Sequence, residues 1–254
     1  MLMAAFISAA RRPSMPEPDD IIARALGYPY PRPTHSYLFC GGGAKELPPE
    51  SDFAGRVPVL ACGSNGSPAQ LQRKYEKFPQ TSIPVTAATL RDVVCVYSAH
   101  FTGYGSVAAA LCAAPGARSF VHLNWLTADQ LTRMHETEAV GQNYRYVEIP
   151  GLNLHCSENG NMQSVFAYVS LRGRLLLDGA PVALGGIDCV DAPFPILDQR
   201  EIQRRLRDIL APGMDLYDFI RQNVSDARLR AERTALLDRH AQAFDHPGMK
   251  ILLE

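Results

Sequence analysis

Two short stretches of this sequence carry side chains that could do chemistry. The first is Cys62-Gly63-Ser64-Asn65-Gly66, which lies between an apolar run at 57–61 and a polar run that starts at Ser67-Pro68. The pattern predicts a strand, a tight loop and a helix, because Ser caps helix N-termini and Pro fits the first turn. Glycines and a helix start can bring backbone N–H groups to an anionic or carbonyl oxygen. An ordinary strand-to-helix turn has the same pattern.

The second stretch places a glutamate on the apolar side of a predicted helix. Residues 127–130 read T-x-x-Q, a capping box that begins the helix. Leu131, Met134 and Glu138 then follow with helical spacing. A carboxyl placed there loses hydration and faces the negative end of the helix dipole, a setting that suits general acid–base chemistry. Alternatively, the helix ends one or two residues earlier and Glu138 is a solvated or Arg-paired loop residue. Periodicity alone does not decide between the two.

Strand-like segments between and after these stretches must position them. Strands are predicted at residues 90–100, 106–113 and 120–126, with a turn at Pro115-Gly116. In the last of these, Val121, Leu123 and Trp125 alternate with His122 and Asn124, which predicts one core face and one polar face. Ser157–Gly160 is a hairpin signal that joins 152–156 to 163–170. From Asp198 onward the periodicity is helical.

Together these patterns predict an α+β fold, with a small mixed, barrel-like β-sheet, flanking helices and further helices at the C-terminal end. The chain of 254 residues is long enough for one large domain with appendages. We expect three parts: a partly irregular N-terminal extension (1–56), a central domain (57–220) with a β-excursion near 171–190, and a C-terminal helical extension (221–254).

Composition excludes several classes of function. The net charge of −1 makes a general nucleic-acid binder unexpected. The six cysteines are scattered, with neither a Cys-x-x-Cys pair nor a Cys/His cluster. We therefore expect reduced thiols in the core and no zinc site. The apolar start, Met1–Ala10, lacks a basic segment before it and predicts no secretory signal, and no stretch is long enough to span a bilayer. We therefore expect a cytoplasmic protein with no metal, no cofactor, and no nucleic-acid or membrane partner.

In order and spacing, these motifs resemble the gamma-glutamylcyclotransferase-like family, which includes AIG2-like and aminoglycoside-pathway members. The similarity rests on the Gly63-Ser64-Asn65 loop after a strand, the run G-Y-G-S-V at 103–107, the helix ending M-H-E-T-E at 134–138, and Tyr144 at the start of a strand. It covers roughly residues 57–169. In the family the strand ends in a Tyr-Gly-Ser-Asn-like loop, and a pattern similar to L-D-x-x-E-G ends the helix. Here Cys62 replaces the aromatic residue and Ala139 replaces the glycine.

The resemblance implies a role for each of these residues. Glu138 matches the catalytic acid–base glutamate. The resemblance therefore favours the interpretation in which Glu138 lies on the apolar face of the helix over the one in which it is a solvated or Arg-paired loop residue. Cys62, Gly63, Ser64, Asn65 and Tyr144 match substrate-binding positions. The family's reaction is release of 5-oxoproline from a gamma-glutamyl amide, a transferase- or lyase-type cleavage in which the substrate's own amine attacks. The implied partner is a small gamma-glutamyl or related aminoacyl amide, and the C-terminal helices could join two copies of the chain.

Two alternatives belong to other classes of function. One is a non-catalytic, small-molecule-binding or regulatory member of the same fold, with Cys62 as a sign of divergence. The other is a serine-type amide hydrolase that uses Ser64 as nucleophile, although the loop lacks the G-x-S-x-G pattern and no Asp/His pair stands out.

Overall fold

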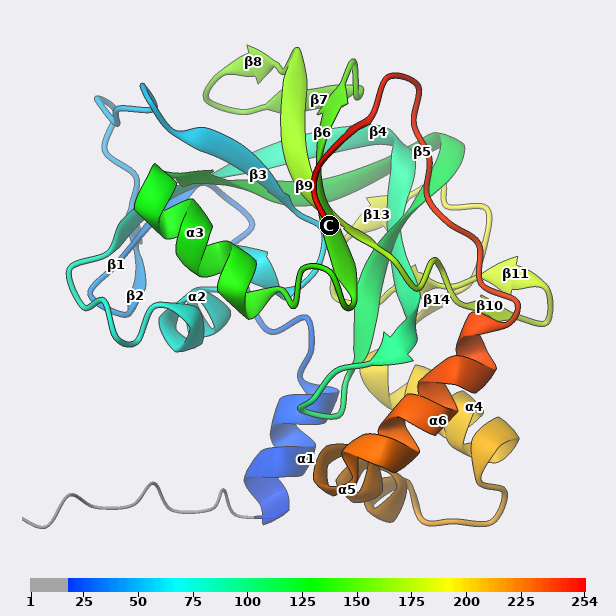
Figure 1. Cartoon of the computed structure of the whole chain (residues 1–254). Coiled ribbons are helices and arrows are strands. Elements are labelled where there is room, and N and C mark those ends of the chain that lie inside the picture. Colours follow the sequence, from blue (N-terminus) through cyan, green and yellow to red (C-terminus); the bar gives the residue numbers. More distant parts are fainter. Residues whose placement is uncertain (1–17) are drawn as a thin grey trace, which may run out of the picture.

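The computed structural model describes residues 18–254 and is built around one long, bent hairpin (Figure 1). Its two strands, β4 (Ser82–Phe101) and β5 (Val107–Leu126), have 20 residues each and pair antiparallel. β3 (Val57–Ala61) pairs antiparallel with β5 and parallel with β9 (Ser164–Ser170), which in turn pairs antiparallel with β6 (Tyr144–Pro150). The sheet is therefore mixed, as the sequence predicts.

Shorter strands pair with these strands or with one another. They are β1 (Tyr37–Cys40), β2 (Gly43–Glu46), β7 (Leu154–Cys156), β8 (Gly160–Asn161), β12 (Ala183–Leu184), β13 (Cys189–Val190), β14 (Ile196–Leu197) and β15 (Lys250–Leu253). β10 (Leu176–Leu177) and β11 (Ala180–Pro181) form a separate pair. The sheet runs β14-β12-β4-β5-β3-β9-β6-β15 and stays open, with β14 and β15 at its ends. This confirms the α+β, barrel-like expectation without a closed barrel.

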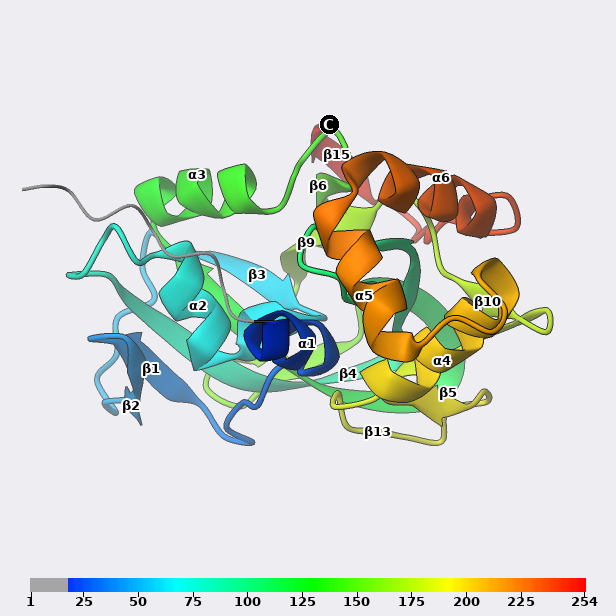
Figure 2. The same cartoon turned by 90° about the horizontal axis from the view of Figure 1, so that it is seen from below.

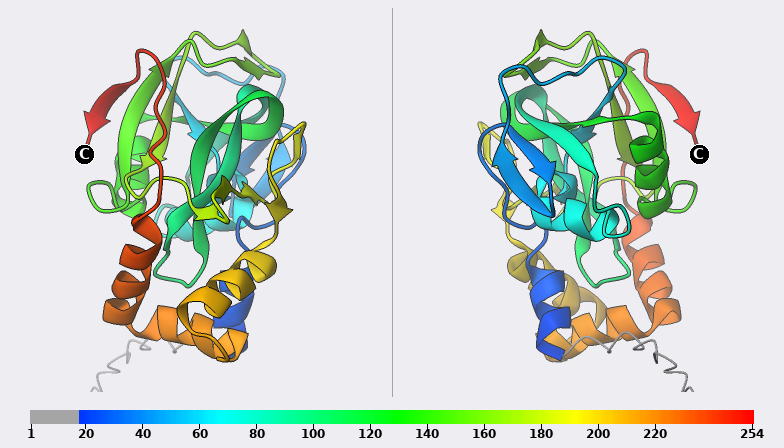
Figure 3. Two further views of the ribbon diagram at one scale, coloured as in Figure 1. Left: turned by 90° about the vertical axis from the view of Figure 1, so that its right-hand side faces the viewer. Right: turned by 90° about the vertical axis from the view of Figure 1, so that its left-hand side faces the viewer.

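The helices form two groups, on opposite sides of the view in Figure 2. One group holds α2 (Pro68–Lys74) and α3 (Ala128–Thr137), which contact each other beside β3 and β5. The other group holds α1 (Pro18–Leu26), α4 (Gln199–Leu210), α5 (Leu216–Ser225) and α6 (Ala227–Asp238), gathered at one end of the sheet (Figure 3). Ile22 and Ala25 of α1 pack on Leu216 and Ile220 of α5, which ties the start of the chain to its C-terminal helices.

Three strand predictions need correction. Residues 106–113 and 120–126 belong to one strand, β5, because Pro115-Gly116 forms a bulge instead of a turn: Arg91 pairs with Arg118, whereas Val93 pairs with Ala113. The predicted polar face of 120–126 is also buried, with Asn124 0% and His122 3% exposed, because other elements cover both faces of the strand. The turn at 157–160 joins β7 to β8, and β9 pairs with β3 and β6 instead.

Both predicted extensions contribute strands to the sheet. Within 1–56, β1 pairs with β4, and within 221–254, β15 pairs with β6. The excursion near 171–190 supplies β12 and β13, which pair with β4 and β5. The division at 57 and 220 stays a prediction, and the apolar start, Met1–Ala10, lies outside the described residues.

Two further features concern the chain's environment. Between residues 18 and 254 no helix is long and apolar enough to cross a membrane. All six cysteines are free thiols, and four of them are buried: Cys62, Cys95, Cys112 and Cys156.

Candidate active site

The Gly-Ser-Asn loop lies where β3 leaves the sheet. Ser64–Gly66 form a turn of 3₁₀-helix, η1, which separates the strand from α2. Ser67 stands at the predicted N-cap of α2, but its hydroxyl donates to the carbonyl of Pro31 at 2.8 Å instead of accepting from the helix. The loop is therefore anchored to the segment between α1 and β1.

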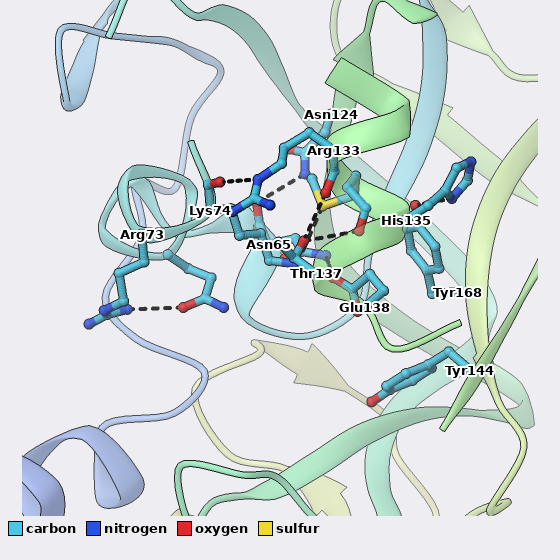
Figure 4. A network of polar contacts seen from close by, with 12 residues as sticks. Asn65, Arg73, Lys74, Asn124, Arg133, His135, Thr137, Glu138, Tyr144 and Tyr168 are labelled. Carbon is cyan, nitrogen blue, oxygen red and sulfur yellow. Dashed lines mark hydrogen bonds and ion pairs between the residues drawn. The ribbon is translucent and has the colours of Figure 1, made fainter. Parts of the chain in front are cut away.

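Glu138 lies at the C-terminal end of α3, directly beside that loop. The capping box of Thr127 and Gln130 forms as predicted, and the helix ends at Thr137 with Glu138 as its C-cap. The Glu138 side chain is only 13% exposed, and the amide nitrogen of Asn65 donates to its Oε1 at 2.8 Å (Figure 4). Each of the two interpretations of Glu138 is therefore correct in one respect. The helix ends one residue before Glu138, as in the loop interpretation, but the side chain is largely shielded from solvent, as in the helix interpretation.

Lys74 is the ion-pair partner of Glu138. Its side chain is 5% exposed, at the end of α2, and its ammonium group donates to Glu138 Oε1 and to Met134 Sδ, the latter at 3.4 Å. Because Asn65 and Lys74 both bond to Oε1, Oε2 of Glu138 has no hydrogen bond from the residues that the structure describes. This oxygen is the one that could exchange a proton with a bound molecule.

Ala139, directly after Glu138, has an unusual backbone conformation. Ala139 has φ +49°, in the left-handed region that favours glycine and commonly ends helices. The alanine keeps the backbone turn, at a cost in strain, and Glu138 keeps its position.

A cavity of about 170 Å³ brings together all six site residues predicted from the sequence. They are Cys62, Gly63, Ser64, Asn65, Glu138 and Tyr144. Its lining also includes Tyr28, Lys74, His100, Tyr104 and Tyr168. The volume is below the roughly 300–1,000 Å³ of common ligand pockets, so the cavity suits one group the size of an amino acid.

Tyr144 does not orient Glu138 through its hydroxyl. That hydroxyl donates to the carbonyl of Ala109 at 3.0 Å. Burial, and then the nearby Glu138 charge, raises the pKa of Tyr144 well above its usual value. Burial likewise raises the pKa of Tyr28 and of Tyr104. The three tyrosines therefore stay neutral and form polar but uncharged walls.

His100 and Cys62 add two buried groups to this lining. Burial lowers the pKa of His100 to about 3, and its Nδ1 lies 2.8 Å from the Ser98 hydroxyl, so the ring is neutral near pH 7. The neighbouring Cys62 thiol, together with burial, raises the pKa of Cys95. Among the described residues no hydrogen bond joins Ser64 to a histidine, as a serine nucleophile would require.

Sequence reasoning missed two residues that hold the site in place. Lys74 follows Ser67, Gln70 and Leu71 with helical spacing, so a lysine on the inner stripe of α2 was a readable signal. Asn124 donates from its amide nitrogen to the carbonyl of Asn65 at 3.1 Å. The sequence carries no signal for this role, because Asn124 lies on the predicted polar face of its strand.

The described residues contain no group of three or more His, Cys, Asp or Glu side chains that could hold a metal ion. Neither a protein-family model nor a curated protein sequence matches the chain.

Three solved structures are similar to this chain. A structure named gamma-glutamyl cyclotransferase is 13% identical, over 78% of this chain and 94% of that one, with a TM-score of 0.35. Two Arabidopsis thaliana proteins, At5g39720.1 and At3g28950.1, are 17% and 16% identical, with TM-scores of 0.36 and 0.33. They cover 48% and 46% of this chain, and 73% and 62% of their own lengths.

Proposed function

We propose that this chain is a cyclotransferase-type enzyme that releases 5-oxoproline from a gamma-glutamyl, or related aminoacyl, amide without a metal ion. One observation carries the proposal: Glu138 is held by Asn65 and Lys74 through Oε1, and it lines the same small cavity as the Gly63–Asn65 loop. In this proposal, Glu138 supplies a carboxyl group and the Gly63–Asn65 loop supplies backbone N–H groups to one amino-acid-sized volume.

In the proposed step, Oε2 of Glu138 takes a proton from the substrate's α-ammonium group. The freed amine attacks the γ-carbonyl carbon, and a new C–N bond closes a five-membered ring. Backbone N–H groups of Gly63–Asn65 stabilise the negative charge that develops on the carbonyl oxygen. The original amide C–N bond then breaks as Glu138 returns this proton to the leaving nitrogen. The ring nitrogen gives up its second proton, which Glu138 accepts and the released amine takes up. The products are 5-oxoproline and a free amine, and no water is consumed.

The magnitudes suit a site of this kind. Holding the amine and the carbonyl in a reactive arrangement contributes up to about 7–11 kcal/mol in good intramolecular cases. A positioned acid–base group adds roughly 10²–10⁴-fold. The cavity holds the glutamyl group, and the leaving amine extends beyond it, so residues at the cavity rim select the leaving group.

Glu138→Gln tests this proposal, because glutamine keeps the shape and removes the base. The assay measures 5-oxoproline released from a panel of gamma-glutamyl dipeptides, amines and glutathione. Glu136→Gln is a matched control: it lies in the last turn of α3, two residues before Glu138, but it is 59% exposed and, among the described residues, pairs with Arg133 alone. We expect release by the wild type and by Glu136→Gln, and a loss of roughly 10²-fold or more in Glu138→Gln.

Other outcomes would select an alternative. Equal release by wild type and Glu138→Gln would contradict the assigned role of Glu138. Saturable binding of a gamma-glutamyl compound without turnover would support a binding or regulatory member of the fold. Release of glutamate, blocked by a serine-directed reagent, would support the hydrolase that uses Ser64.

A further inference from the structure

The strand β15 forms the outer edge of the sheet, beyond β6. It pairs antiparallel with β6, and in the described part of the chain no further strand lies on its other side (Figure 3, drawn in red). The backbone groups on that side therefore have no partner strand between residues 18 and 254. An exposed edge of this kind offers N–H and C=O groups to a strand of another chain.

The side chains of β15 are unusually apolar for an exposed edge. Ile251, Leu252 and Leu253 are consecutive in the chain, and they are 49%, 49% and 43% exposed. Single apolar residues on a surface are ordinary, whereas a contiguous exposed group marks an interaction site. The structure therefore favours β15 over the C-terminal helices as the place where another chain binds. The helices α4, α5 and α6 each expose a single large apolar side chain, namely Ile209, Tyr217 and Leu236.

This edge is only weakly protected against pairing. Natural edge strands are commonly protected by a charge or a proline within them, or by a bulge that twists the edge away. Between Lys250 and Glu254 the sequence has neither a charge nor a proline. A bulge does lie between Ile251 and Leu253, but it leaves the apolar side chains of the strand exposed.

The sequence of the edge is complementary to itself. Residues 250–254 read K-I-L-L-E, so an antiparallel pairing of two copies about Leu252 sets Lys250 of each copy opposite Glu254 of the other. Each end of the pairing gains two opposite charges, and the apolar residues meet one another in the middle. Lys250 contacts Glu148 of β6 at 3.3 Å, but its side chain is 66% exposed and its ammonium group has further N–H donors for a second carboxylate.

We propose that two copies of this chain associate through β15, in an antiparallel pairing related by a two-fold axis at Leu252. A two-fold interface uses the same patch on both copies, which suits a self-complementary edge. The pairing satisfies the free backbone groups, removes the apolar side chains from water and joins the two sheets. This inference does not depend on the proposed reaction, because no residue of β15 lines the cavity at Glu138.

Sedimentation equilibrium of the full chain across the micromolar range tests whether it dimerises. We expect a concentration-dependent equilibrium between monomer and dimer. Leu252→Asp should weaken the dimer roughly tenfold or more, because it places two like charges together in the middle of the interface. Ile196→Asp is the matched control, since Ile196 is 51% exposed on β14, at the opposite end of the sheet. Leu236→Asp probes the alternative contact through α6 and should leave the dimer unchanged.

Single cysteines test the register of the pairing. On the two-fold axis the two residues at position 252 lie directly opposite each other, within reach of a disulfide, whereas the two residues at position 250 lie roughly 14 Å apart. Under mild oxidation with diamide, Leu252→Cys should therefore form a covalent dimer beyond any formed by the wild type, and Lys250→Cys should not. Glu254→Lys should weaken the dimer, because it turns two attractive charge pairs into repulsive ones, and added salt should reduce the difference.

Circular dichroism establishes that each variant folds. If Leu252→Asp does not fold, Glu254→Lys and the cysteine variants keep the test decisive, because they change an exposed or partly exposed side chain without adding charge to the apolar run. A wild type that sediments as a monomer throughout the micromolar range overturns the proposal. It is also overturned if folded Leu252→Asp dimerises like the wild type, if Leu236→Asp abolishes the dimer, or if Lys250→Cys cross-links as fully as Leu252→Cys.

Discussion

Replacing Lys74 by methionine should destabilise the fold strongly, because it leaves the Glu138 carboxylate buried without its counter-ion. The two side chains are 5% and 13% exposed, and removing one member of so buried a pair costs about 3–5 kcal/mol. Glu138 keeps the hydrogen bond from Asn65, so we place the loss near the lower end, about 3 kcal/mol. Methionine retains most of the apolar stem, so packing losses stay small.

The assay is equilibrium unfolding in urea, for Lys74→Met, Glu138→Gln and the double variant. The double variant should recover part of the loss, because it no longer buries an unpaired charge. Arg228→Met is the surface control: its pair with Glu232 has side chains 90% and 57% exposed and should contribute less than about 1 kcal/mol. A Lys74→Met loss as small as that of Arg228→Met, or strictly additive single and double variants, would refute the reasoning.

Three further predictions concern other parts of the site. Gly63→Ala should lose activity and about 1–3 kcal/mol of stability, because its Cβ would clash with the buried Tyr28 hydroxyl. In the control Gly103→Ala the added Cβ meets nothing within 4 Å, and equal unfolding midpoints of the two variants would contradict the prediction. Ala139→Gly should stabilise the fold by up to about 1 kcal/mol by relieving the positive φ, and a loss in thermal unfolding would refute it. Because the pKa of His100 falls from 6.5 to about 3 on folding, the unfolded chain binds its proton first and stability drops as pH falls below 6.5. His100→Asn should remove a share of that drop, roughly 1.4 kcal/mol for each pH unit between those values, and identical pH profiles would contradict it.

Local patterns in the sequence, together with the resemblance that their order carries, pointed to the candidate site. The loop at Gly63–Asn65 and the phase of Glu138 are set by residues within a few positions, so strand, turn and helix rules apply directly. The position of Tyr144 was also predicted, but the acceptor of its hydroxyl was not, since Ala109 lies 35 positions away in the chain.

Features that depend on distant segments could not be predicted. Pro115-Gly116 fits a turn or a bulge equally well, and the pairing of β4 with β5 decides between them. Asn124 and His122 looked like a solvated face because nothing in their strand shows what covers it.

The oxygen atoms of the product give the most direct test of the proposed reaction. A gamma-glutamyl substrate that the enzyme turns over is incubated in water enriched in heavy oxygen, and the products are analysed by mass spectrometry. Intramolecular attack by the α-amine predicts 5-oxoproline and free amine in equal amounts, with no heavy oxygen incorporated at turnover. Glutamate carrying one heavy oxygen would instead show that water attacks the carbonyl, and this would contradict the account.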